Sequence, residues 1–188
     1  FVILVILLVL YIVHENYRRD QELMKYAQTD ALTGLYNKET TKLRTDEILS
    51  TDKDMIHAFL ILDMDCFKQI NDGYGHAVGD IVLQKFGQLL RDIFREDDIV
   101  GRIGGDEFVV VMKNIKMKEM AIAKAEELLT KTQQYEIKEL NGSAISISIG
   151  IAMAPEDGEC YMDLYKRADQ ALYQAKRSGK ARVCNYFS

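Results

Sequence analysis

The chain has 188 residues, 48% of them hydrophobic and 28% charged, which is typical of one globular domain with a buried core and excludes a disordered protein. Its 24 basic and 29 acidic side chains leave a net charge of −5, which argues against a nucleic-acid polymer as partner. The chain has three cysteines, Cys66, Cys160 and Cys184, which are odd in number and far apart. We therefore expect neither a disulfide framework nor a structural zinc site, and this cysteine content is consistent with a reducing compartment.

Residues 1–13 (FVILVILLVLYIV) are uninterruptedly apolar and predict a helix. At about 1.5 Å per residue this helix would reach roughly 20 Å, short of the about 30 Å hydrocarbon core of a bilayer. Because the chain also starts without Met, we interpret the segment as the end of a truncated transmembrane helix. A secretory signal would need a preceding basic stretch and a following small-residue cleavage site, which the sequence lacks, and a buried core helix is the remaining alternative.

Arg18 and Arg19 follow the apolar run. Under the positive-inside rule they place the rest of the chain in the cytoplasm, anchored to the inner membrane. Residues 14–29 are largely polar and charged and contain no Gly or Pro, which suits a helical linker. Residues 30–188 are then expected to form one domain.

The first half of this domain predicts a strand, a helix and a hairpin. Residues 58–62 are a continuous apolar run, typical of a strand buried on both faces. Apolar side chains recur with helical spacing over 78–93. Two apolar segments, 99–103 and 108–112, flank the Gly104-Gly105 pair, which predicts a hairpin.

The second half predicts a helix, a strand and a further helix. Helical spacing of apolar residues covers 117–128, and isoleucines alternate with small or polar residues over 145–151, as in a half-buried strand. A last helical pattern covers 161–175, and residues 181–186 are expected to close the sheet as an edge strand. The order strand, helix, hairpin, helix, strand predicts an α/β (α+β) domain of the ferredoxin-like, split βαβ type, with an antiparallel central sheet preceded by an N-terminal helix.

This topology has a chemical consequence for three carboxylates. The first strand should lie antiparallel beside the second hairpin strand, so Asp63 at its end should meet Asp106 and Glu107 in the hairpin turn. Like charges brought together repel and lose solvation, so such a cluster favours a bound cation. Carboxylates together with substrate phosphates suit Mg²⁺ or Mn²⁺. Taken alone, the Asp-x-Asp at residues 63–65 is better explained as a solvated strand end, and it is the convergence with the diglycine turn that favours a cation site.

Four segments carry a family resemblance: residues 30–37 (DALTGLYN), 63–80 (DMDCFKQINDGYGHAVGD), 102–108 (RIGGDEF) and 168–176 (ADQALYQAK). In this order they closely resemble the GGDEF family, and the resemblance runs over residues 29–183. Active members are diguanylate cyclases, which join two GTP into cyclic di-GMP and release two pyrophosphates. The resemblance therefore implies a cyclase-palm form of the fold and a nucleotidyltransferase.

The resemblance also implies roles at the acidic end of the sheet. Asp63 and Glu107 match the metal-binding carboxylates, and the backbone carbonyl of Met64 matches a further ligand. Asp106 matches a position near the attacking ribose 3′-hydroxyl. Metal ions would lower the pKa of this hydroxyl and stabilise the pyrophosphate leaving group.

The guanine-binding residues implied by the resemblance are Asn71 and Asp80. A carboxylate can accept from the guanine N1–H and exocyclic amine together, whereas adenine lacks this pair of donors. Each residue also has a structural explanation, since Asn71 precedes a turn sequence and Asp80 suits the start of a helix.

The phosphate-binding residues implied by the resemblance come from three segments. Residues Cys66, Phe67 and Lys68 match a short loop that holds the β- and γ-phosphates, partly through backbone N–H groups. The lack of side chains at Gly104 and Gly105 would let ribose and phosphate approach the turn, although ordinary hairpin geometry also explains the pair. Lys176 matches a phosphate-binding lysine. Lys180 stands where many relatives carry Arg, and a lysine lacks the bidentate fork of that residue.

Four other residues of the motifs are ambiguous or structural. Arg102 can reach a phosphate or pair with a neighbouring acid. His76 lies in a Gly-rich stretch without a nucleophile beside it, so we expect a structural hydrogen bond. Turn and capping roles suffice for Asp30 and Asn37.

Residues 95–98 (REDD) form an RxxD motif just before the RIGGDEF segment. By resemblance, Arg95 and Asp98 match the product-inhibition site of many diguanylate cyclases, although a solvated charged turn is the simpler interpretation. The resemblance further implies a homodimer, because the product needs two bonds formed between two nucleotides. The alternatives to an active cyclase are a GGDEF domain that only binds GTP or cyclic di-GMP, and a purely structural dimerisation domain.

Overall fold

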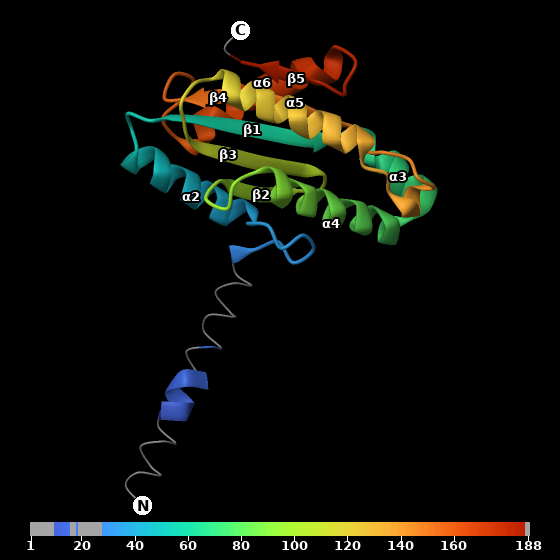
Figure 1. The fold of residues 1–188 in the computed structure, drawn as a ribbon, viewed down its shortest axis with the longest axis horizontal. Coiled ribbons are helices and arrows are strands. Elements are labelled where there is room, and N and C mark those ends of the chain that lie inside the picture. Colours follow the sequence, from blue (N-terminus) through green and yellow to red (C-terminus); the bar gives the residue numbers. More distant parts are fainter. Residues whose placement is uncertain (1–9, 16–17, 19–27, 187–188) are drawn as a thin grey trace, which may run out of the picture.

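The structure is a computed structural model that describes residues 10–15, 18 and 28–186. A five-stranded sheet is packed between helices (Figure 1). The strands are β1 (Ile56–Met64), β2 (Ile99–Gly104), β3 (Glu107–Ile115), β4 (Ile147–Ala154) and β5 (Val183–Asn185). The helices are α2 (Lys38–Thr51), α3 (Phe67–Tyr74), α4 (His76–Ile93), α5 (Glu119–Gln134), the short 3₁₀ helix η1 (Lys138–Leu140) and α6 (Tyr161–Arg177).

The strand order is β2-β3-β1-β4-β5. Strand β1 pairs antiparallel with both β3 and β4, β2 pairs antiparallel with β3, and only β5 runs parallel to its neighbour β4. This confirms the predicted split βαβ topology with an antiparallel central sheet and an edge strand near the C-terminus.

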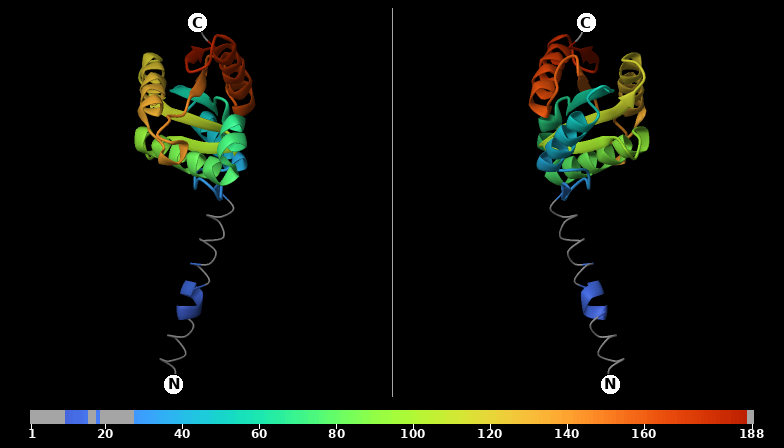
Figure 2. Two further views of the ribbon diagram at one scale, coloured as in Figure 1. Left: turned by 90° about the vertical axis from the view of Figure 1, so that its right-hand side faces the viewer. Right: turned by 90° about the vertical axis from the view of Figure 1, so that its left-hand side faces the viewer.

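Strand β1 lies in the middle of the sheet, and its residues 58–62 are completely buried. Leu60 and Leu62 pack on one face against α4 and α5, whereas Phe59 and Ile61 pack on the other face against α2 and α6. Figure 2 shows the sheet edge-on between these two layers. A strand with helices on both faces must be apolar on both, which explains the continuous apolar run in the sequence.

Helices α2 and α3 are absent from the elements predicted by periodicity, and their sequences explain why. The buried face of α2 consists mainly of threonines, Thr40, Thr41 and Thr45, and α3 has no buried residue at all. The side chain of Asn37 accepts a hydrogen bond from the backbone N–H of Thr40 at 3.0 Å, so Asn37 caps α2 as expected. Capping, and not an apolar stripe, marks this helix in the sequence.

Within the part of the chain that the structure describes, no helix combines the length and apolarity that a bilayer crossing requires. Residues 10–15 are helical. Most of the expected transmembrane segment and linker, at 1–9, 16–17 and 19–27, lies outside the described residues.

Candidate active site at the end of the central strand

The carboxyl end of β1 lies beside the turn between β2 and β3. Asp63 is directly opposite Glu107 in the antiparallel register, and the backbone N–H of Met64 donates to the carbonyl of Asp106 at 3.3 Å. Asp63 is 8% exposed, while Asp106 and Glu107 are half-buried. The structure therefore brings together the three acidic residues that the topology predicts to meet.

The electrostatics of this cluster disfavour negative charge. Burial raises the pKa of Asp63, and the neighbouring charges of Asp106 and Asp65 act in the same direction. Burial, followed by the charge of Asp63, likewise raises the pKa of Glu107. A cation relieves both effects, because it replaces lost solvation and separates the like charges.

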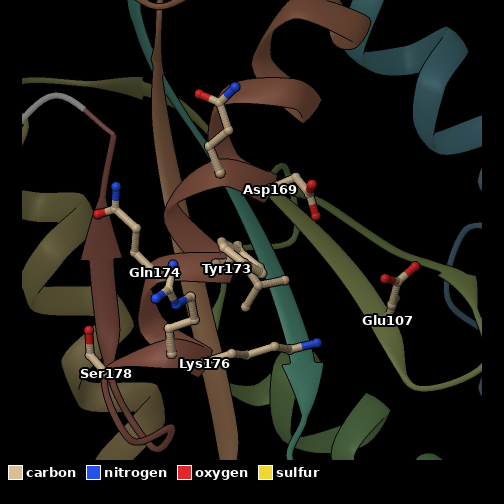
Figure 3. Close-up of a pocket in the computed structure, with 9 residues that line it drawn as sticks. Glu107, Asp169, Tyr173, Gln174, Lys176 and Ser178 are labelled. Carbon is tan, nitrogen blue, oxygen red and sulfur yellow. The ribbon is translucent and has the colours of Figure 1, made fainter.

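One cation of the chain already lies there. The Lys176 ammonium is 2.8 Å from a carboxylate oxygen of Asp63, and this contact opposes the rise in the pKa of Asp63. Figure 3 shows the Lys176 side chain extended across β1 towards the side on which Glu107 lies. The residue that the family resemblance assigns to phosphate is thus paired with a proposed metal-binding carboxylate in this structure.

These residues suit a divalent ion whose coordination shell is completed by oxygen atoms of the substrate. Among residues 10–15, 18 and 28–186, no three His, Cys, Asp or Glu side chains are gathered closely enough to hold a metal by themselves. Asp63 and Glu107 provide two carboxylates, and Mg²⁺ is commonly bound by one or two carboxylates plus substrate phosphates and water. The donor set therefore fits Mg²⁺ or Mn²⁺ together with a nucleotide.

The glycine turn is open, and Arg102 holds it through hydrogen bonds to the carbonyl of Gly105. An added Cβ at Gly104 or Gly105 would meet no atom within 4 Å, so a ligand can approach the backbone of both residues. Arg102 donates from Nε and Nη2 to the carbonyl of Gly105 at 3.0 and 2.7 Å, and from Nη1 to both carboxylate oxygens of Asp30 at 3.1 and 3.2 Å. Of the two roles considered for Arg102, the structure supports pairing with an acid.

Asp30 is itself held by several donors. It accepts from the backbone N–H and the hydroxyl of Thr33 at 2.9 and 2.7 Å, in addition to Arg102. Burial alone would raise the pKa of Asp30, but the hydrogen bonds from Thr33 and Arg102 outweigh it and lower that pKa. The turn role expected for Asp30 is confirmed, and the same residue connects residues 30–33 to the glycine turn.

The two guanine-site candidates, Asn71 and Asp80, lie close to each other on α3 and α4. An added Cβ at Gly79 would lie 2.0 Å from Oδ1 of Asn71, so the Asn71 side chain packs against the backbone just before Asp80. The side chain of Asp80 is exposed. His76 begins α4 as an exposed residue, and within the described chain its ring makes none of the structural hydrogen bonds expected for it.

The phosphate-site candidates gather around the start of α3. Cys66 precedes this helix in the left-handed conformation (φ 61°), and its side chain does not cap the helix. Phe67 and Lys68 form the first turn, with the Lys68 side chain exposed. From the far end of the sequence, the Lys180 ammonium donates to Sγ of Cys66 at 3.2 Å. Two segments assigned separately to phosphate are therefore in contact.

Sequence reasoning missed two acidic residues near this site. Asp169 lines an open groove of about 770 Å³ together with Glu107, Lys176, Tyr173 and Arg177 (Figure 3). Asp65 is buried beneath the loop that carries Lys180. Asp169 belongs to the ADQALYQAK segment, and Asp65 to the Asp-x-Asp sequence, but neither pattern reveals the contacts that these residues make.

Arg95 and Asp98 lie at the opposite end of β2 from Asp106. The buried carboxylate of Asp98 accepts the backbone N–H of Arg95 and that of Lys113, each at 3.0 Å. Arg95 is exposed and borders two surface hollows of about 350 Å³ each, on either side of the turn. The carboxylate of Asp98 thus shapes the turn that presents Arg95, a contact that the RxxD pattern alone does not reveal.

Comparison with known proteins gives a consistent result. The model of the family "Diguanylate cyclase, GGDEF domain" matches residues 27–182. The chain is 37% identical over 168 residues to diguanylate cyclase DgcS of Shewanella oneidensis, covering 88% of this chain and 55% of that protein. It is 35% identical over 182 residues to the biofilm architecture maintenance protein MbaA of Vibrio cholerae, covering 92% of this chain and 23% of that protein. The chain therefore spans about half or less of these curated relatives.

Solved structures agree on the fold. The GGDEF domain of TpbB (YfiN) from Pseudomonas aeruginosa superimposes with a TM-score of 0.79 at 34% identity, covering 84% of this chain and 94% of that chain. The GGDEF domain of DgcB from Caulobacter crescentus, solved in complex with c-di-GMP, gives a TM-score of 0.79 at 27% identity, covering 86% and 97%.

Proposed function

Because this chain belongs to the GGDEF diguanylate cyclase family, we propose that it condenses two GTP molecules into cyclic di-GMP. Each ribose 3′-oxygen forms a bond to the α-phosphorus of the other nucleotide, and each α–β phosphoanhydride bond breaks to release pyrophosphate. The 3′-hydroxyl protons leave to solvent. The observation that carries this proposal is the pairing of Asp63 with Glu107 beside the open Gly104-Gly105 turn.

Asp63, Glu107 and the carbonyl of Met64 are the residues proposed to hold a divalent cation, Mg²⁺ or Mn²⁺. When bound, this ion would lower the pKa of the attacking hydroxyl and stabilise the charge on the leaving pyrophosphate. Asp106 would orient the 3′-hydroxyl. Lys176 would exchange its contact with Asp63 for a phosphate oxygen of the nucleotide, which keeps the charge of the site balanced.

Asp80 and Asn71 are proposed to recognise guanine, with the Asp80 carboxylate accepting from N1–H and the exocyclic amine. The exposure of Asp80 and the position of Asn71 beside it support this assignment. The backbone at residues 66–68 and the ammonium groups of Lys176 and Lys180 would bind the triphosphate. Lys176 contacts Asp63 in β1 and Lys180 contacts Cys66 at the start of α3, which supports one shared phosphate site.

Catalysis is proposed to need two copies of the chain, because one domain offers one set of these residues while the product contains two new bonds. The N-terminal segment is proposed to hold the two copies together and to anchor them at the inner membrane, with the catalytic domain in the cytoplasm. The Arg95 turn is proposed to bind cyclic di-GMP as a feedback inhibitor. Its exposed arginine and bordering hollows support this assignment.

The test is incubation of the purified chain with GTP and MgCl₂, followed by chromatography and mass spectrometry of the products. We expect cyclic di-GMP and pyrophosphate in a 1:2 ratio, and no product in the presence of EDTA. Binding of GTP or cyclic di-GMP without turnover would favour the alternative, a non-catalytic GGDEF module.

A further inference from the structure

Asp65 is a buried carboxylate that the proposed chemistry does not use. It follows β1 directly and is 8% exposed. Its Oδ1 accepts from the hydroxyl of Ser148 at 2.8 Å, and its Oδ2 accepts from the hydroxyl of Ser146 at 2.6 Å and from the backbone N–H of Ala181 at 3.1 Å. Burying a carboxylate is costly unless it is well hydrogen-bonded, and here both oxygens are satisfied.

The backbone N–H of Ala181 belongs to a strained segment. Lys180 and Ala181 both adopt left-handed backbone conformations, with φ of 62° and 49°. Two consecutive non-glycine residues in this region are unfavourable and persist only where surrounding contacts enforce them. The backbone N–H of Lys180 is held by the carbonyl of Ala175 at the end of α6, and that of Ala181 by Asp65. Asp65 therefore anchors one of the two backbone N–H groups of this segment.

The segment presents Lys180 to the start of α3. Because Asp65 immediately precedes Cys66, the same residue fixes both the loop of Lys180 and the chain that enters the proposed phosphate-binding segment at 66–68. The contact between the Lys180 ammonium and Sγ of Cys66 joins the two segments. The hydrogen bond with Cys66, followed by smaller contributions that include the charge of Asp65, raises the pKa of Lys180.

We propose that Asp65 is a positioning residue that holds Lys180 against the segment at 66–68 and thereby sets the affinity of the site for the β- and γ-phosphates of the nucleotide. This inference rests on the proposed function, since it assumes that a guanine nucleotide occupies the site. It predicts that Asp65 acts on the phosphate end of the ligand and leaves guanine recognition unchanged.

Two ligands distinguish binding of the terminal phosphates from recognition of guanine. Guanosine 5′-(α,β-methylene)triphosphate carries the terminal phosphates but cannot release pyrophosphate, and GMP lacks those phosphates. In calorimetric titrations with Mg²⁺, we expect Asp65→Asn to weaken the triphosphate analogue about tenfold, as for the loss of one charge-assisted hydrogen bond. The affinity for GMP should change by less than about twofold.

A double-mutant cycle tests whether Asp65 acts through Lys180. In the Lys180→Ala background, Asp65→Asn should cause little further loss of affinity for the triphosphate analogue, because the group that it positions is absent. The matched control is Asp157→Asn, since the Asp157 carboxylate also orders a loop by accepting a backbone N–H, that of Met153, at 2.7 Å. This control should retain the wild-type preference for triphosphate over GMP.

Hydrogen exchange provides a measurement that does not depend on nucleotide binding. The Ala181 amide should lose protection in Asp65→Asn and in Asp65→Ala, and retain it in Asp157→Asn. Equal weakening of both ligands by Asp65→Asn, additive effects in the cycle, or unchanged protection of Ala181 would overturn the proposal. Failure of the wild-type chain to bind either nucleotide would overturn the proposed function and the ligand part of this inference, while the exchange data would still decide whether Asp65 holds the loop.

Discussion

The end of β1 brings acidic side chains together, and burial raises the pKa of Asp63 and Glu107 among them. Asp63→Ala or Glu107→Ala should therefore remove a proposed metal ligand and lower cyclic di-GMP synthesis by more than about a hundredfold, as is typical for the loss of essential electrostatic stabilisation. Product formation at saturating GTP and MgCl₂ measures this effect. Glu126→Ala, at an exposed position on α5, is the matched control and should retain activity. Turnover like that of the wild type in either site variant would contradict the assignment.

The same cluster should lower stability at neutral pH. Burial and the charge of Asp63 raise the pKa of Glu107 above its usual 4.5, so the native state binds this proton more tightly than the unfolded state. Stability then falls as pH rises from about 4.5 through the folded-state pKa, and this loss persists at pH 7. In EDTA at pH 7, Glu107→Gln should raise Tm by roughly 2 °C, and the gain should disappear near pH 4. With GTP and MgCl₂, the same variant should be inactive. An unchanged or lower Tm at pH 7 would show that the glutamate charge is not destabilising.

How much of this site follows from sequence depends on the range of the contacts. The meeting of Asp63 with Glu107 follows from strand order, because antiparallel pairing fixes which residues lie opposite. The partners of Asp65 are Ser146, Ser148 and Ala181, more than 80 positions away along the chain, and no local pattern encodes them. The sequence likewise does not show which group Arg102 binds, whereas the fold places Asp30 beside it.

Among the elements, helix α2, which apolar periodicity does not predict, packs closely against its neighbouring strand. Strand β2 meets α2 at Gly101, where an added Cβ would lie 1.9 Å from Oγ1 of Thr41. Gly101→Ala should therefore lower the free energy of unfolding by about 1–3 kcal/mol, the usual cost of overpacking. Urea denaturation measures this change. Combining Gly101→Ala with Thr41→Ala should restore part of the loss, and purely additive destabilisation would contradict the proposed clash.

The boundaries of the predicted elements differ from the observed ones where apolar patterning ends before the hydrogen bonding does. Helix α5 continues from the predicted end at residue 128 to Gln134 through a largely polar turn, and β1 continues from the predicted end at residue 62 through Asp63 to Met64. Helix α2 is missed as a whole for the same reason, because its buried face consists mainly of threonines. Periodicity reports which side chains are apolar, whereas these segments are fixed by caps, backbone hydrogen bonds and neighbouring strands.

Arg102 connects residues 30–33 to the glycine turn at Gly104-Gly105. Arg102 uses one guanidinium group to bond both Asp30 and the carbonyl of Gly105. Arg102→Lys keeps the charge but lacks the fork, so it cannot hold both partners at once. We expect a fall in kcat of about tenfold with little change in stability, because the turn is repositioned and not unfolded. Initial rates and thermal melts of this variant provide the measurement. An unchanged kcat would show that the turn keeps its geometry without this link.

For the molecule as a whole, the proposed chemistry needs two active sites facing each other. Specific activity should then rise with enzyme concentration until the dimer is saturated. Removal of residues 1–20 should shift this rise to higher concentration, because the N-terminal segment is proposed to raise the effective concentration of the second domain. Initial rates measured across the micromolar range for both forms test this expectation. A specific activity of the truncated chain that is independent of concentration would contradict it.

Feedback by product should act at the opposite end of β2 from the chemistry, and the structure separates the roles of the two motif residues. The Arg95 side chain is exposed between two hollows, whereas the two oxygens of Asp98 accept the backbone N–H of Arg95 in the turn and that of Lys113 in β3. Since the turn lies away from Asp106, bound cyclic di-GMP would leave the catalytic groove open and inhibit by fixing the orientation of the domains.

Inhibition should therefore be non-competitive with GTP. Arg95→Ala should relieve it and keep the initial rate in the absence of added product. Asp98→Ala should instead lower the free energy of unfolding by about 1–3 kcal/mol, because it leaves two backbone donors without their acceptor. Initial-rate curves against GTP at several cyclic di-GMP concentrations, together with urea denaturation, distinguish these outcomes. Inhibition that GTP overcomes, or that persists unchanged in Arg95→Ala, would show that the turn is an ordinary charged surface whose arginine binds no product.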